Sequence, residues 1–429
     1  MFQLKDFGVS KNTGILKNGS KVFHFYKSNM PVSTAVIFDA GSKYDPVGKE
    51  GLAHFVEHIL FKSTKKFKDE TEAGVFLESI GGQANAFTGV DYLGITADIG
   101  MGLDYPKVVD FLHELTKESL FDPNKIEIER GTILGEIADY ESNPALHIHD
   151  LLQKQLFQDT YAERSVAGDA DSVLGITRKD LYDFYLSKVA AKNMSVVVAG
   201  DIEFEKIMDL FNESFGDGEP FEENLEIKEL EKFRDNPIGI KIYKDIDHIF
   251  MGFSFRTCPY TNEDTNTLDV IETMIGEGFS SSLFRKLRTE NGLVYSLNVS
   301  SQGYFDRGHF SVITATSKDN IQQVSDILAE EFKRLERGDT KEEELELAKN
   351  KIIKSKIREM QNSNSWVGFH LPEIFFNPSK PLDLAESLNE IEKIGFEDIA
   401  TTSKKYFSKD NWYLALCGDV SESDFSVNY

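Results

Sequence analysis

Apolar residues recur along the first third of the chain with two different periods, which predict strands mixed with helices. The segments 33–42 and 83–99 contain apolar and β-branched runs typical of buried strands joined by turns. Helical spacing of apolar residues predicts helices at 50–61, 70–80, 103–118 and 124–141. This mixture indicates α+β domains, each with a mainly antiparallel sheet and helices packed on one face.

One helix–strand pattern occurs twice. Residues 176–202 and 394–420 align without a gap at a constant offset, and each reads as a helix, an Asn and a buried strand that ends in Gly-Asp. The alternative is chance similarity between two common units. The matching Asn193 and Asn411 favour duplication, which predicts two homologous domains.

The expected boundary between the two domains lies where the composition changes. Residues 218–236 are rich in acidic residues, contain Gly and Pro, and show no strong apolar period, which is typical of a linker. We therefore expect one domain at 1–217 and a homologous domain at 237–429.

Composition narrows the function classes. The net charge of −25 and the sequence pI of about 4.8 argue against a nucleic-acid-binding protein, because no basic face is available to neutralise phosphates. The two cysteines, Cys258 and Cys417, support neither a disulfide framework nor a cysteine metal site. No secretory signal and no membrane-spanning apolar run is recognisable, so we expect a cytoplasmic protein without a membrane partner.

The segment 51–61, GLAHFVEHILF, contains the strongest chemical signal. His54 and His58 are one helical turn apart, so both imidazoles can bind one ion, and Glu57 can deprotonate a water beside them. The string H-x-x-E-H is the inverzincin signature. The alternative is a pair of surface histidines. The apolar residues between them favour a buried helix and therefore a metal site, since buried histidines are costly without a partner.

Zinc requires a third protein ligand, and a later helix offers several. Glu129 and Glu136 are seven residues apart, so they share a face of the predicted helix 124–141. Glu127 and Asp139 are further candidates, and spacing alone does not choose among these four. His147 and His149 form a rival pair, for which solvent-facing positions are the simpler interpretation.

Three blocks of the sequence resemble the pitrilysin family of peptidases, peptidase family M16, which includes insulin-degrading enzyme and mitochondrial processing peptidase. The blocks are His54 to His58 followed by Glu136, the segment GGQANAFTGVDY (81–92), and the segment GEGFSSSLFRKLRTENGLVYS (276–296). The similarity extends over essentially the whole chain. The first block is highly specific, and the other two are specific in its company.

The resemblance implies a zinc metalloendopeptidase with one Zn2+ per chain. It implies that Glu136 is the third zinc ligand, that Glu57 is the general base, and that Glu129 supports the site from behind the ligands. It also implies that Asn85 and Ala86 bind an extended substrate as an added strand.

The resemblance further implies that Arg288 and Tyr295 bind the substrate carbonyl and stabilise the oxyanion. The segment Gly276-Glu277-Gly278 departs from the family, because many relatives have a third glycine in place of Glu277. The chain has the length of the short branch, whose members pair two chains into a clamshell. The second half has no H-x-x-E-H segment, so each chain should hold one zinc. Because Arg288 and Tyr295 are present in this chain, we expect a homodimer with shared active sites.

The expected function is hydrolysis of unfolded peptides or presequence-like segments. Two alternatives share the fold: a non-catalytic assembly subunit, such as the core proteins of respiratory complexes, and a processing subunit that needs a different partner chain. The intact set of His54, Glu57, His58 and Glu136 argues against the first. The presence of Arg288 and Tyr295 argues against the second.

Overall fold

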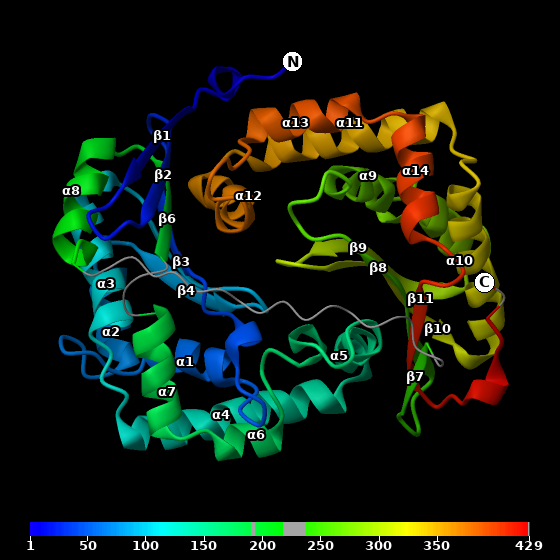
Figure 1. Cartoon of the computed structure of the whole chain (residues 1–429), viewed down its shortest axis with the longest axis horizontal. Helices are drawn as coiled ribbons and strands as arrows, with labels where there is room; N and C mark the ends of the chain where they lie inside the picture. Colours follow the sequence, from blue (N-terminus) through cyan, green and yellow to red (C-terminus); the bar gives the residue numbers. More distant parts are fainter. Residues whose placement is uncertain (190–193, 218–236, 428) are drawn as a thin grey trace. The chain divides into compact units, whose positions relative to one another are not determined.

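The computed structural model describes residues 1–189, 194–217, 237–427 and 429, which form two compact units (Figure 1). The first unit comprises Met1–Ile137, Ser165–Glu226 and Ile357–Ser387, and the second comprises Ala138–Arg164, Ile227–Lys356 and Leu388–Tyr429. Residues 138–164 of the first half thus belong to the second unit, and residues 357–387 of the second half belong to the first. The predicted domains, 1–217 and 237–429, did not include this exchange of segments. The predicted linker 218–236 and Asn193 lie outside the described residues.

The first unit contains a six-stranded sheet in the order β1-β2-β6-β3-β5-β4. The strands are β1 (Ser10–Ile15), β2 (Lys21–Tyr26), β3 (Val32–Phe38), β4 (Gln83–Thr88), β5 (Leu93–Ile99) and β6 (Met194–Gly200). β2 and β6 are parallel, and the other neighbours are antiparallel. This order leaves β1 at one edge of the sheet and β4 at the other.

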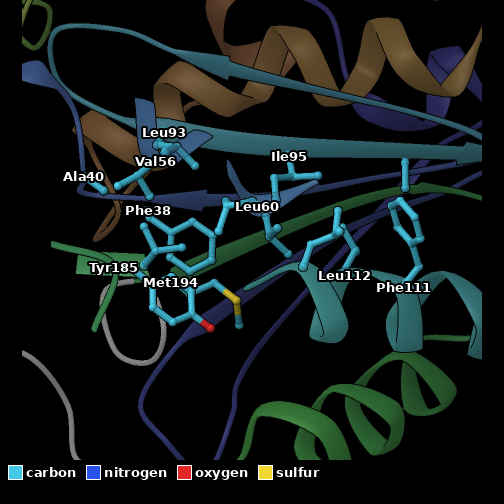
Figure 2. Packing of buried hydrophobic residues seen from close by; sticks show 14 of the residues in the cluster. Phe38, Ala40, Val56, Leu60, Leu93, Ile95, Phe111, Leu112, Tyr185 and Met194 are labelled. Atoms are coloured by element: carbon cyan, nitrogen blue, oxygen red, sulfur yellow. The ribbon is translucent and has the colours of Figure 1, made fainter. Parts of the chain in front are cut away.

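A layer of helices covers one face of this sheet, as predicted. Its members are α1 (Leu52–Leu60), α2 (Glu70–Glu78), α3 (Tyr105–Lys117), α4 (Pro123–Ser142), α6 (Ala170–Gly175), α7 (Arg178–Phe184) and α8 (Phe204–Phe215). Figure 2 shows Phe38 of β3 with Val56 and Leu60 of α1 in the core below the sheet. α1, α2, α3 and α4 agree with the helices predicted at 50–61, 70–80, 103–118 and 124–141 to within a few residues.

On the other face of the sheet lies α12 (Ser363–Phe376), which comes from the second half of the chain and packs on β3 and β6. The Ser33 and Ser363 hydroxyls are 2.7 Å apart, and the Phe25 ring stacks on the His370 ring at 3.8 Å. β3 is buried on both faces for this reason, with Thr34 bound to the Tyr105 hydroxyl of α3 on the opposite side.

The second unit contains a five-stranded sheet in the order β7-β11-β8-β10-β9. Its strands are β7 (Ile238–Ile242), β8 (His248–Thr257), β9 (Val294–Gly303), β10 (Gly308–Ser317) and β11 (Trp412–Gly418). Its longer helices are α5 (Pro144–Leu156), α9 (Thr265–Gly276), α10 (Ile321–Glu336) and α14 (Phe396–Tyr406). Two further helices, α11 (Glu342–Glu359) and α13 (Leu384–Lys393), each have residues in both units.

Alternating side chains of β11 separate the two faces of the second sheet. Leu414 and Leu416 join the core formed with α9, α10 and α14, whereas Ala415 and Cys417 join α5 on the other face. Because alternate side chains of β11 point to opposite faces, helices from both halves of the chain pack on the same sheet.

The two sheets share a topology that supports the duplication. β6 is parallel to β2 and antiparallel to β3, and β11 is parallel to β7 and antiparallel to β8. The repeated helix–strand segments therefore place their strands in equivalent positions. None of the described helices is long and apolar enough to cross a membrane.

Candidate metal centre

Helix α1 begins at a specific N-terminal arrangement. The Asp45 carboxylate accepts hydrogen bonds from the backbone N–H groups of Gly51 and Ala53, each at 2.9 Å, which pairs amides that the helix itself cannot satisfy. Gly51 has a φ of 90°, and a Cβ atom there would lie 2.4 Å from the carbonyl oxygen of Ala167. Any larger residue at the start of this helix would therefore require the backbone at Gly51 or Ala167 to move.

The apolar face of α1 orients its polar side chains. Phe55, Val56 and Leu60 are fully buried in the core, as the sequence predicted. His54, Glu57 and His58 are partly exposed and lie on the remaining face. Burial of one helix face thus directs both imidazoles and the carboxylate to the same side.

The structure brings His54, His58 and Glu136 together. The Nε2 atoms of His54 and His58 are 3.1 Å apart, and Glu136 Oε2 lies 3.7 Å from His58 Nε2. Among the described residues, these three form the group of side chains whose ligand atoms could hold a metal ion. Glu136 is half-exposed on α4, so its carboxylate can be reached from solvent.

Glu129 occupies a different position from Glu136. Its Oε1 atom lies 2.7 Å from Nδ1 of His58, and its Oε2 atom lies 2.9 Å from the Lys62 ammonium. Because a carboxylate only accepts, Nδ1 of His58 must carry the proton, which leaves the Nε2 lone pair free for an ion. Glu129 thus holds the tautomer and ring orientation of His58, and Lys62 holds Glu129.

The donor set fits zinc. Two ligands of a tetrahedral zinc ion with bonds of about 2.1 Å lie about 3.4 Å apart, which is close to the spacings of the two Nε2 atoms and of Glu136. Burial, with the neighbouring His58, lowers the pKa of His54 to about 4, so its ring is neutral and can donate a lone pair at neutral pH. Two nitrogens and one carboxylate oxygen also leave a fourth position open.

Glu57 lies beside this group and is oriented by a strand. The Thr88 hydroxyl at the end of β4 donates a hydrogen bond of 2.6 Å to Glu57 Oε2. Burial raises the pKa of Glu57, and the hydrogen bond from Thr88 opposes that rise. A carboxylate with a raised pKa can accept a proton and release it again.

The predicted substrate-binding residues Asn85 and Ala86 lie on the edge strand β4. They pair with Thr96 and Ile95 of β5, and Asn85 is exposed. An edge strand presents backbone groups on its outer side to which an extended peptide can add. The same strand carries Thr88, so it connects the predicted peptide site to Glu57.

Arg288 and Tyr295 belong to the second unit and lie together there. Arg288 Nη1 donates to the carbonyl oxygen of Tyr295 at 3.0 Å. The Tyr295 side chain is 59% exposed and its ring lies 4.5 Å from that of His248. The arrangement leaves the phenol ring accessible to a ligand.

The remaining candidates from the sequence lie outside the metal group. Glu127 pairs with Arg130 at 3.0 Å, and Asp139 is exposed. His147 is partly exposed, and its Nδ1 atom lies 2.7 Å from the Tyr243 hydroxyl, whereas His149 is exposed.

No function was predicted for Lys62 or Thr88 from the sequence. Lys62 follows His58 by four residues, a spacing that places the two on the same side of a helical turn and could have drawn attention to it. Thr88 has no such signal, since only folding brings the end of β4 to α1.

Two family models match most of the chain. Residues 24–170 match the model described as "Insulinase (Peptidase family M16)", and residues 175–352 match the one described as "Peptidase M16 inactive domain". Together the matches cover more than half of the chain, and the first contains the whole metal group.

Individual proteins are similar over most of their length. An uncharacterized zinc protease of Mycobacterium bovis is 26% identical over 393 residues, which covers 90% of this chain and 88% of the relative. The crystal structure of a peptidase M16 inactive domain from Pseudomonas fluorescens has a TM-score of 0.86 at 18% identity and covers 96% of this chain and 99% of its own. A chain of complex III2 from Candida albicans has a TM-score of 0.81 at 14% identity, with coverage of 97% and 98%. These structural likenesses establish the fold alone.

Proposed function

The chain belongs to the M16 family of peptidases, and from this premise we propose that it is a zinc-dependent endopeptidase that hydrolyses unfolded peptides. One observation carries the proposal: His54, His58 and Glu136 converge on one point, with Glu57 beside them on the same helix face. The zinc protease named among the relatives supports the same metal.

Zinc held by His54, His58 and Glu136 would supply a Lewis acid beside the scissile carbonyl. Glu57 takes a proton from the attacking water and passes it to the departing amine, for which its raised pKa is suited. Thr88 keeps the Glu57 carboxylate in place during both transfers. An extended peptide adds to β4 through Asn85 and Ala86, so that strand positions substrate and base together.

Arg288 and Tyr295 supply the second part of the proposed chemistry. Their side chains bind the substrate carbonyl and stabilise the negative charge that develops on its oxygen. The hydrogen bond between Arg288 and the Tyr295 backbone supports a common function for the two residues.

The simplest assembly is a homodimer whose active sites are shared between two copies of the chain. The metal group belongs to the first unit, and Arg288 and Tyr295 belong to the second. A two-fold pair that places the second unit of one chain over the metal group of the other gives two equivalent sites in a clamshell.

Mixing two inactive variants tests the shared site. Glu57→Gln and Arg288→Ala, mixed under conditions that allow chain exchange, form a mixed dimer with one doubly defective site and one intact site. Activity should then return to at most about half the wild-type rate per mixed dimer if the sites are independent. If exchange is demonstrated and no activity returns, Arg288 acts within its own chain or has no role.

A non-catalytic or partner-dependent subunit is the second candidate. The likeness to a chain of a respiratory complex and to an M16 inactive domain favours it at the level of fold. The intact metal group favours catalysis instead.

Digestion of a peptide library distinguishes these candidates. We expect the zinc-loaded protein to cleave internal bonds, a zinc chelator to abolish cleavage, and added Zn2+ to restore it. Absence of cleavage by the protein that contains zinc would favour the non-catalytic subunit.

We also propose a cytoplasmic location for the protein. Cys258 and Cys417 are both buried free thiols, which supports a reducing, cytoplasmic location.

A further inference from the structure

A cavity lies at the β1 edge of the first sheet, on the face that α12 partly covers. It has a volume of about 720 Å³ and is lined by the β1–β2 hairpin, the turn 378–381 and Glu386. Volumes of this order are typical of small-molecule sites. The lining contains Lys11, Lys21 and Lys380.

Strand register brings the charged and apolar lining residues to one face. Thr13 pairs with Phe23, and Ile15 pairs with Lys21, across the antiparallel hairpin. Residues directly opposite in such a pair project to the same side of the sheet, as do alternate residues along each strand. Phe23 is buried and forms an apolar floor, while Lys21 stands beside it.

The turn 378–381 holds two ammonium groups in place. Lys21 donates to the carbonyl oxygen of Pro378 at 2.8 Å, and Lys11 donates to that of Pro381 at 3.2 Å. An ammonium has three N–H donors, so each lysine retains donors after this bond. Lys380 is exposed on the same turn. The cavity thus contains preoriented positive charge.

The sign of this charge opposes that of the whole chain. The chain carries a net charge of −25, with 72 acidic and 47 basic residues. Glu386 is the acidic residue of the lining, and one of its carboxylate oxygens accepts the Asp383 backbone N–H at 2.9 Å in a capping box, so three lysines share the cavity with one carboxylate. The local excess of lysines therefore favours an anion over a cation in this cavity.

The cavity is separate from the metal centre. It adjoins β1, whereas Glu57 is bound by Thr88 of β4, and these strands form opposite edges of the sheet. Five inter-strand spacings correspond to about 24 Å. A ligand in the cavity therefore does not touch the metal ligands.

We propose that this cavity binds a small organic phosphate, with its phosphate on Lys11, Lys21 and Lys380 and its apolar part on Phe23 and Ile15. Lysine binds phosphate as a point charge, whereas planar carboxylates favour the arginine fork, which the lining does not contain. This inference is independent of the proposed peptidase activity.

Titration of the full chain with phenyl phosphate at low salt, followed by calorimetry and ³¹P line broadening, tests the site. We expect saturable binding with a dissociation constant of about 1 mM or lower. Lys21→Met and Lys380→Met should each weaken it about fivefold or more, because each removes a charged hydrogen bond. Lys17→Met, an exposed lysine on the same hairpin outside the lining, removes the same charge and should leave binding unchanged.

Three outcomes would overturn the inference. One is no saturable binding at about 10 mM ligand. Another is equal weakening by Lys17→Met, which would indicate general charge attraction. The third is equally tight binding of benzoate, which would mean that the site does not prefer a phosphate to a carboxylate. Lys380→Met keeps the test valid if Lys21→Met detaches the turn, since the Lys380 side chain is exposed. His58→Ala should bind phenyl phosphate normally.

Discussion

Glu57→Gln should slow peptide cleavage at least ~100-fold while the protein still binds zinc and peptide. Glutamine preserves the shape of the side chain and can still accept the hydrogen bond that Thr88 donates at 2.6 Å. It cannot take a proton from water, so only the proton transfers are lost. The measurement is kcat on a peptide from the library, with zinc content and peptide affinity determined in parallel.

Thr88→Val is the matched control for this variant. It keeps the carboxylate but removes its hydrogen bond, so Glu57 becomes less well oriented and cleavage should fall only about 10-fold. A near wild-type rate for Glu57→Gln would mean that the base lies elsewhere. An equal loss in both variants would mean that orientation, not proton transfer, dominates.

His58→Ala should reduce the zinc content from close to one ion per chain to almost none. The substitution leaves His54 and Glu136, and two ligands cannot hold the ion firmly in competition with water. It also leaves the Glu129 carboxylate without the imidazole that lies 2.7 Å from it. Metal analysis of the purified variant, after dialysis against a weak chelator, measures the loss.

Lys62→Met provides a graded comparison. It leaves all three ligands and removes the cation that lies 2.9 Å from Glu129 and 2.5 Å from Glu70. Zinc affinity should fall by no more than about 10-fold, less than the 10- to 100-fold expected when a residue bonded directly to a ligand is lost, because Lys62 acts on His58 only through Glu129. Stoichiometric zinc in His58→Ala would exclude His58 as a ligand. An unchanged affinity in Lys62→Met would exclude Lys62 as a positioning residue.

Local periodicity was sufficient to predict most of the elements near the metal group. Helices predicted at 50–61 and 124–141 are α1 and α4, and the strand predicted at 33–42 overlaps β3. The spacing of His54 and His58 also survives folding unchanged, since one helical turn defines it. These features depend on residues that are close in sequence.

Contacts between distant segments could not be derived in this way. Spacing placed Glu129 and Glu136 on one helix face, but only the packing of α4 against α1 puts Glu129 at Nδ1 and Glu136 at Nε2 of His58. Thr88 reaches Glu57 because β5, the hairpin partner of β4, also pairs with the distant strand β3 and so places Thr88 at the edge of the six-stranded sheet. Such pairings join residues far apart along the chain, and no local period encodes them.

The exchange of helices between the two units shows most clearly the difference between what local sequence patterns determine and what long-range packing determines. A repeated segment at a constant offset was enough to indicate two related domains, because each copy repeats its own local pattern. That α12 covers the first sheet and α5 the second follows only from the tertiary structure. Both faces of each central strand are apolar, and an apolar face can be buried by any helix of suitable shape, so complementarity in three dimensions selects which helix binds there.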